Sequence, residues 1–374
     1  MRKLIVLLIG LACLQPACST TASQRAGRII LPTPVEETVA SVHIMVHPNV
    51  ELISIIQHIS KYGETFPFLL NNNDFRYRED IVRQFRQHSD HDAIRFMDDV
   101  SLKPRMYNFS APPTSMLYLD ESFRLREDLV HDDFLMARIG GVDSLRRFGE
   151  YLGDYSQQAG FAEFYAEHAA YYKSLVDSVK SKFDEVNYVE ELEAFYGTRQ
   201  ESYNLILVPL YGHVGFGPHV DSREGDTHIF NIMGPQSVES GVLNFGDKSY
   251  FKKMQRHEFS HSFVNPLTEK YWDEAVELAY LFERLPETAR KEVCGDWQEC
   301  LNEHVVRAVT TYLAYMEGEE TGRKAREYEI GRGMIFLDDL MTAIRVYESK
   351  RDQYPTFDSY YDELLAALRK HPKE

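Results

Sequence analysis

The chain has 374 residues, of which 44% are hydrophobic and 13% aromatic, so it can bury a sizeable core in one large domain or two ordinary ones. It carries 41 basic and 58 acidic residues, which gives a net charge of −17. An acidic chain without a long basic stripe repels phosphate backbones, so we expect no nucleic-acid partner.

The first segment indicates export. Arg2 and Lys3 precede an apolar run, LIVLLIGLACL, that is too short to hold a bilayer as a stable helix. The pattern predicts a bacterial signal peptide over residues 1–17. Cys18 follows in LQPACSTT, a loose lipobox, and residues 18–35 have the small polar composition of a tether. We expect a lipoprotein, periplasmic or attached to the outer membrane, that contacts the membrane only through a lipid on Cys18. Soluble release by cleavage nearby is the alternative.

Hydrophobic periodicity predicts the remaining elements in chain order. The amino-terminal part gives a strand over 38–46, a helix over 49–63, a helical pattern over 74–100, a proline-interrupted loop over 103–117, and helices that dominate 122–197. Strands are then predicted over 202–210, 227–234 and 241–245, with a glycine-rich connection between the first two. Later helices are predicted over 249–265, 271–285, 298–317, 333–350 and 358–369. The first of these is expected to stop before Pro266, because proline disfavours helix in the residue that precedes it.

These elements predict a helix-rich α+β fold in which a small mixed sheet precedes the helix over 249–265. We divide the chain into a mainly helical part over 36–200 and a catalytic part over 201–374, which can also form one compact unit. Cys294 and Cys300, in CGDWQEC, are the cysteines left for the fold. In an exported chain their spacing favours a local disulfide, with buried free thiols or metal ligands as alternatives.

The segment RHEFSHSFVNP carries the clearest chemical signal. His257 and His261 are four residues apart, so a helix places both imidazoles on one face with Glu258 beside the first. This H-E-x-x-H pattern predicts two metal ligands and a general base. The competing interpretation is a helix whose histidines bind nothing.

A small sheet followed by an H-E-x-x-H helix resembles the zincin metallopeptidases, in which an edge strand pairs with an extended peptide. The gluzincin branch fits better than the metzincin branch, because Val264 and Leu267 occupy the glycine and third-histidine positions of the metzincin motif. The leader, VHPNVELISII and HEFSHSFVNP together also resemble an uncharacterised family of exported bacterial proteins with a proposed zinc-protease motif. That second resemblance spans most of the chain and implies no known activity.

The gluzincin resemblance implies a third zinc ligand from a glutamate on a later helix. Glu303, in CLNEHVVRAVTTYL, is the first choice. Its rivals are Glu277 and Glu283 on the intervening helix, and His304, which follows Glu303 directly. The alternative for Glu303 is a solvated helix face on which it pairs with Arg307 at i+4.

The implied cofactor is Zn²⁺, the implied substrate is a peptide or protein, and Glu258 would accept a proton from water and pass it to the leaving amine. The donor to the oxyanion stays open among Tyr312, Tyr315, Arg307 and His304. Three further histidines in the strand-and-loop region are expected to be ordinary loop residues, with the alternative that one of them lines the cleft: His213, His219 and His228. The alternative function is an exported binding or scaffold lipoprotein with a structural or degenerate metal site.

Overall fold

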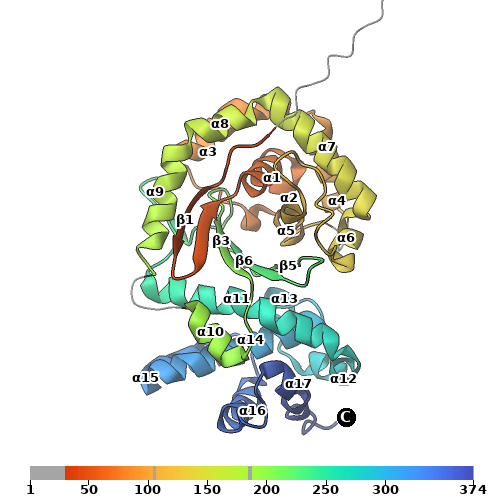
Figure 1. Ribbon diagram of the computed structural model, residues 1–374, viewed down its shortest axis with the longest axis vertical. Helices are drawn as coiled ribbons and strands as arrows, with labels where there is room; N and C mark the ends of the chain where they lie inside the picture. Colours follow the sequence, from red (N-terminus) through yellow and green to blue (C-terminus); the bar gives the residue numbers. More distant parts are fainter. Residues whose placement is uncertain (1–29, 104–106, 184–187, 374) are drawn as a thin grey trace, which may run out of the picture.

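The computed structural model describes residues 30–103, 107–183 and 188–373, and it confirms the helix-rich α+β fold with a small mixed sheet. The sheet lies between an amino-terminal and a carboxy-terminal group of helices (Figure 1). The predicted signal peptide and Cys18 lie outside the described residues. Within the described ranges, no helix combines the length and the apolar character needed to span a membrane.

The sheet has the strand order β1-β2-β3-β6-β4, and β5 also pairs with β6. An antiparallel hairpin opens it, formed by β1 (Val35–Val39) and β2 (Val42–Val46). Parallel pairs join β2 to β3 (Ser202–Leu207) and β3 to β6 (Thr227–Met233). The antiparallel strands at the far edge are β4 (Gly215–Phe216) and β5 (His219–Asp221). A separate hairpin is formed by β7 (Ser237–Glu239) and β8 (Val242–Asn244).

Two expectations about the sheet region were wrong. The single strand over 38–46 is a hairpin, because Ala40 and Ser41 adopt positive φ values of 47° and 64° and turn the chain in two residues. The tether does not extend to residue 35, because β1 begins there and Leu31 is already buried. The glycine-rich connection contains the short strands β4 and β5.

The first helical group lies above the sheet in Figure 1. Its helices are α1 (Pro48–Ile59), α2 (Lys61–Thr65), α3 (Arg76–Phe85), α4 (Asp92–Ser101), α5 (Ala111–Ser115), α6 (Asp133–Ile139), α7 (Val142–Ala159), α8 (Phe161–Glu167) and α9 (Ala169–Lys180). Short 3-10 helices are η1 (Pro67–Leu69), η2 (Arg86–His88) and η3 (Met116–Tyr118). Figure 1 shows α7, α8 and α9 following one another around the outside of this group. The predicted loop over 103–117 therefore contains a short helix, α5.

The second helical group packs on the other side of the sheet. It consists of α10 (Tyr188–Tyr196), α11 (Lys248–Lys270), α12 (Trp272–Val276), η4 (Ala279–Arg284), α13 (Glu287–Glu292), α14 (Trp297–Glu317), α15 (Glu319–Gly331), α16 (Leu337–Ser349) and α17 (Phe357–Ala366). The helix predicted over 271–285 is split into α12 and η4, and α15 was not predicted. In Figure 1, α11 runs directly below the sheet, and α14 to α17 lie beyond it.

The expected end of the motif helix was also wrong, because α11 continues through Pro266 to Lys270. A proline inside a helix removes one hydrogen bond and costs about 3 kcal/mol. Val264 and Thr268 are fully buried on either side of it, so packing of this segment offsets that cost.

The boundary predicted near residue 200 cuts through the sheet. Strand β2 pairs with β3 along its length, from Val42 opposite Tyr203 to Met45 opposite Ile206. The buried apolar side chains form one cluster that draws on both sides of that boundary, for example Ile53 and Leu205.

Candidate metal centre

Helix α11 carries the H-E-x-x-H segment and is fixed at its start and along its buried side. The carboxylate of Asp247 caps its first turn by accepting a hydrogen bond from the backbone N–H of Tyr250 at 2.8 Å. Phe259 packs edge-on against Tyr203 of β3, with ring centroids 5.6 Å apart. Phe263 stacks on Tyr196 of α10 at 4.3 Å. His257 and His261 lie on the opposite side of α11 and therefore face away from the sheet.

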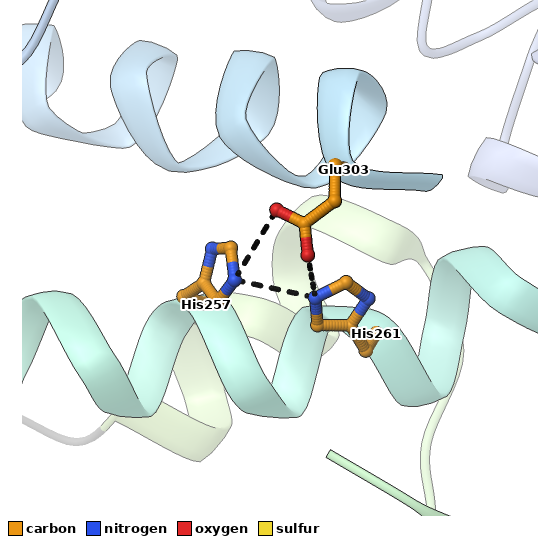
Figure 2. Close-up of side chains that lie close together, drawn as sticks. All are labelled: His257, His261 and Glu303. Atoms are coloured by element: carbon orange, nitrogen blue, oxygen red, sulfur yellow. Dashed lines mark hydrogen bonds and ion pairs between the residues drawn. The ribbon is translucent and has the colours of Figure 1, made fainter. Parts of the chain in front are cut away.

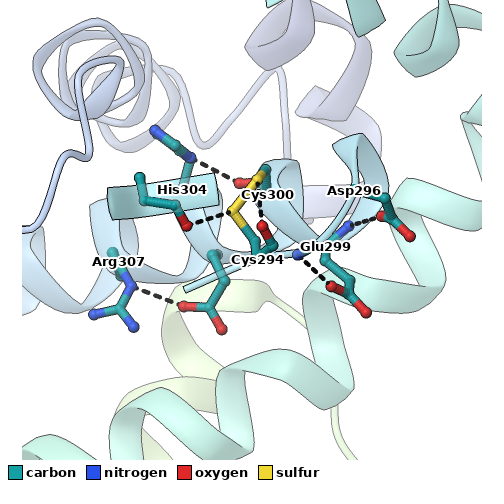
Figure 3. The surroundings of a disulfide bond; sticks show 9 residues. Cys294, Asp296, Glu299, Cys300, His304 and Arg307 are labelled. Atoms are coloured by element: carbon teal, nitrogen blue, oxygen red, sulfur yellow. Dashed lines mark hydrogen bonds and ion pairs between the residues drawn. A yellow bond between two sulfur atoms is a disulfide. The ribbon is translucent and has the colours of Figure 1, made fainter. Parts of the chain in front are cut away.

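Helix α14 lies along that opposite side. It begins at a second capping residue, Asp296, whose carboxylate accepts from the backbone N–H of Glu299 at 2.9 Å. A disulfide joins Cys294 to Cys300 in the first turn of α14 (Figure 3). The bridge and the cap together fix the start of the helix that carries Glu303.

Figure 2 shows the three side chains meeting between the two helices. The Nε2 atoms of His257 and His261 are 3.2 Å apart. One Glu303 oxygen lies 3.8 Å from His257 Nε2, and the other lies 3.4 Å from His261 Nε2. Among the described histidine, cysteine, aspartate and glutamate residues, these three bring their ligand atoms together, all within 4.8 Å of one another. Glu277 and Glu283, the rivals for the third position, are not in it.

The donor atoms fit a zinc ion by separation and by chemistry. Two nitrogens that bind a tetrahedral zinc at about 2.0–2.1 Å lie roughly 3.3–3.4 Å from each other, close to the separation found here. The Nδ1–H of His261 donates to the side-chain oxygen of Asn265 at 3.2 Å. In the neutral imidazole this hydrogen bond leaves the Nε2 lone pair free to bind a metal.

A buried chain of ion pairs supports Glu303 on the side away from the two histidines. Arg307 donates from Nε to Glu303 at 2.7 Å and from a terminal nitrogen to Glu329 of α15 at 2.6 Å. The other oxygen of Glu329 pairs with Lys253 of α11 at 2.9 Å. The Glu303–Arg307 pair is the one expected for a plain helix face, but here it is buried, and it leaves the second Glu303 oxygen directed at His261.

The protonation of the cluster follows from burial and charge. Burial lowers the pKa of His257 well below its usual value, a shift that the Glu303 carboxylate only partly opposes. Burial also disfavours the charged form of His261, but the hydrogen bond and charge of Glu303 raise the pKa of His261 overall. Despite its burial, Glu303 has a pKa well below its usual range, because Arg307 and the two histidines stabilise the carboxylate. Glu303 is therefore ionised at neutral pH.

Glu258 lies in a tight contact with the edge strand. It is 5% exposed, and burial raises the pKa of its carboxyl to about 7. A Cβ on Gly215 would lie 2.5 Å from the Glu258 carboxylate oxygen Oε1, and a Cβ on Gly217 would lie 2.1 Å from the Glu258 backbone oxygen. Only glycine allows this approach. Sequence reasoning missed both residues, although the repeated glycines of GFG before Pro218 were a signal for close backbone contact.

The His257–His261–Glu303 cluster opens into a cleft of about 1460 Å³ between the two helical groups. Strand β4 forms part of the wall of this cleft. In the described part of the chain, β6 is the one strand that pairs with β4. The far end of β5 is covered, because the backbone N–H of Val130 donates to Asp221 at 2.8 Å. Among the described residues, the two-residue strand β4 therefore presents an edge without a strand partner to the cleft, beside the His257–His261–Glu303 cluster.

The three further histidines and the four possible oxyanion donors lie in different surroundings. His213 and His219 line the cleft, and His213 shares a 2.5 Å hydrogen bond with Tyr250. His228 instead bonds to the hydroxyl of Ser202 at 2.8 Å. Of the four possible oxyanion donors, Arg307 lines the cleft. His304 is buried with its Nδ1 on the Cys300 carbonyl, and the other two pack against neighbouring helices: Tyr312 on Phe195 and Tyr315 on Gly322.

Comparison with known proteins gives one match. The family model described as "Domain of unknown function (DUF4932)" matches residues 129–367. Searches of curated proteins and of solved structures find no match. The matched region contains α11 and α14 with His257, His261 and Glu303, as well as the β4 edge. Because the match covers more than half of the sequence, the chain belongs to the family described as a domain of unknown function (DUF4932).

Proposed function

We propose that the protein is a zinc-dependent hydrolase, and specifically a peptidase, with Glu258 as general base. The observation that carries the proposal is the convergence of His257, His261 and Glu303 in a cleft. Two histidines and one carboxylate are a ligand set used by catalytic zinc, which keeps a further position open for water or substrate. Within the described residues the group has three members, as such a site requires.

The roles of the chain's own residues follow from their positions. When bound, zinc supplies Lewis-acid chemistry and lowers the pKa of water towards neutrality. Glu258 follows His257 on the same helix and faces the cleft, where its carboxylate can accept a proton and later return it to a leaving amine. Because Gly215 and Gly217 have no side chains, the edge strand lies directly against Glu258 and restricts where the Glu258 carboxylate can lie.

The peptide substrate class is supported by the open edge of β4. An extended polypeptide can add to such an edge through backbone hydrogen bonds, which hold any sequence. The edge and the metal centre share one cleft, so a chain bound to β4 would pass the His257–His261 pair.

Metal content and turnover test the proposal together. Purified wild-type protein should hold one zinc per chain, and His257→Ala with His261→Ala should lose it. Glu258→Gln should keep the metal while hydrolysis of a broad peptide library falls by at least about a hundredfold, the effect of removing a general base. Glu287→Gln, an exposed carboxylate in α13, is the matched control and should change neither. Equal hydrolysis by wild type and Glu258→Gln would refute the mechanism.

One observation favours the alternative, an exported binding or scaffold lipoprotein with a structural or degenerate metal site. Glu303 is already satisfied by Arg307, so the carboxylate has a structural partner without any metal. Wild-type protein that holds zinc but cleaves no peptide in the library would support this alternative.

A further inference from the structure

The exposed phenylalanines of this protein gather in one place. The sequence contains 22 phenylalanines, and most of those described are buried or half-buried. Within the described residues the three exposed ones are Phe68, Phe109 and Phe134, at 61%, 45% and 73% exposure. All three line the cleft that contains the metal centre, on the wall opposite α11. Exposed apolar side chains that cluster in a concave surface mark a binding site. We call these three residues the aromatic wall.

The aromatic wall is held in place by specific contacts. Phe68 lies in η1, which is tied to the entry of the edge strand because Gly212 N–H donates to the Leu69 carbonyl at 2.9 Å. The rings of Phe68 and Phe109 are 5.9 Å apart. Phe109 has a φ of 52°, a left-handed conformation that a bulky residue rarely adopts. A strained residue that also exposes a large apolar ring is typical of a functional site.

Arg138 contacts Phe134 and the residue directly before Phe109. It donates to the backbone carbonyl of Asn108 at 2.7 Å, directly before Phe109. The same guanidinium lies 5.8 Å from the ring centre of Phe134. The position of Phe134 is therefore linked to that of Phe109.

The charge of the cleft restricts what can bind beside the wall. Outside the metal centre, carboxylates line it at Asp132, Asp133, Asp221, Glu269, Asp296 and Glu299. The lining also contains four cations, fewer than its carboxylates: Arg138, Lys253, Arg307 and Arg332. Lys253 is paired with Glu329 and Arg307 with Glu303. A cationic or neutral ligand complements this lining, and an acidic ligand is repelled.

We propose that the aromatic wall is a subsite for a large apolar side chain of an extended, basic or neutral polypeptide. This inference rests on the proposed peptidase function and adds a substrate class to it. The short β4 edge favours a polypeptide over a lipid or a sugar, because it offers backbone hydrogen-bonding groups in the same cleft. Lysine or arginine residues that flank the apolar side chain would face the carboxylates.

Binding rather than turnover tests the subsite. The full-length Glu258→Gln protein is titrated into two fluorescent, end-capped peptides of glycine, serine and lysine, one with a central phenylalanine and one with serine there. Fluorescence anisotropy should show that the phenylalanine peptide binds about tenfold or more tightly. Adding Phe68→Ala or Phe134→Ala should weaken that peptide about fivefold to thirtyfold and leave the serine peptide unchanged. Met316→Ala, at an equally exposed apolar residue of α14 outside the cleft lining, should change neither.

The outcomes separate this inference from the proposed function. Discrimination between the peptides that depends on Phe68 and Phe134 supports the subsite even if wild-type protein hydrolyses nothing. Equal affinity for both peptides, no binding of either, or equal losses on both peptides would overturn it even if hydrolysis is real. Binding to phosphatidylcholine vesicles in place of the peptides, lost in the same variants, would also overturn it, because the wall would then contact lipid.

Discussion

The buried chain of ion pairs behind the metal centre makes a quantitative prediction about stability. Arg307 is 8% exposed and joins two carboxylates, Glu303 at 17% and Glu329 at 2%. Arg307→Met keeps an apolar stem but leaves both carboxylates without their main partner in a buried site. Removing one partner of a buried ion pair costs about 3–5 kcal/mol, so we expect the metal-free variant to lose that much free energy of unfolding.

Two further variants calibrate this prediction. Glu329→Gln leaves Arg307 paired with Glu303, so its loss should be smaller, about 1.5–3 kcal/mol for a hydrogen bond to a charged group. Arg323→Met is the matched control, because Arg323 forms ion pairs at i−3 and i+4 on the exposed face of α15 and should contribute little.

Urea unfolding followed by circular dichroism, at neutral pH with a chelator present, measures all three variants. The expected order of destabilisation is Arg307→Met, then Glu329→Gln, then Arg323→Met. Equal urea midpoints for Arg307→Met and Arg323→Met would refute the reasoning. So would a larger loss in Glu329→Gln than in Arg307→Met, since the arginine is the group shared by both pairs.

Three other predictions address different parts of the molecule. Burial raises the pKa of Glu51 from 4.5 to about 7, so its contribution to stability is complete below about pH 4.5 and is lost as the pH rises through 7. Glu51→Gln should therefore be more stable than wild type by about 3 kcal/mol at pH 8 and similar at pH 4, as measured by urea unfolding at both values. Unreduced protein should show no alkylatable thiol at Cys294 or Cys300 by mass spectrometry, and Cys294→Ser with Cys300→Ser should lose at most about 2–3 kcal/mol, because the closed loop is short. Gly217→Ala should lower the free energy of unfolding in urea by about 1–3 kcal/mol through overpacking and should reduce hydrolysis, whereas Gly331→Ala, with no atom near its added methyl, should do neither.

The sequence predicted what local periodicity encodes. An i, i+4 spacing is sufficient to place His257 and His261 together on one face, whatever the helix packs against. Val305 and Val309 have the same i, i+4 spacing in α14, and both are fully buried. The α+β class followed from these patterns and is confirmed by the structure.

Features that depend on tertiary contacts could not be predicted in this way. Pro266 was taken as a helix end because its local preference ignores the buried neighbours that stabilise the continuation. Ala40 and Ser41 carry no glycine or asparagine signal for a two-residue turn, so the first hairpin was read as one strand. The approach of Gly217 to Glu258 and the strained conformation of Phe109 depend on segments far apart in the chain, which periodicity does not connect.

The parallel pairing of β2 with β3 has a practical consequence for anyone who expresses this protein in pieces. The family match begins at residue 129, but β1 and β2 precede it, and so do Phe68 and Phe109. A recombinant fragment cut to 129–367 would leave the backbone groups of β3 without their neighbour along one side. Such an edge is a template for self-association, so the fragment would tend to aggregate. It would also lack two of the three rings of the aromatic wall.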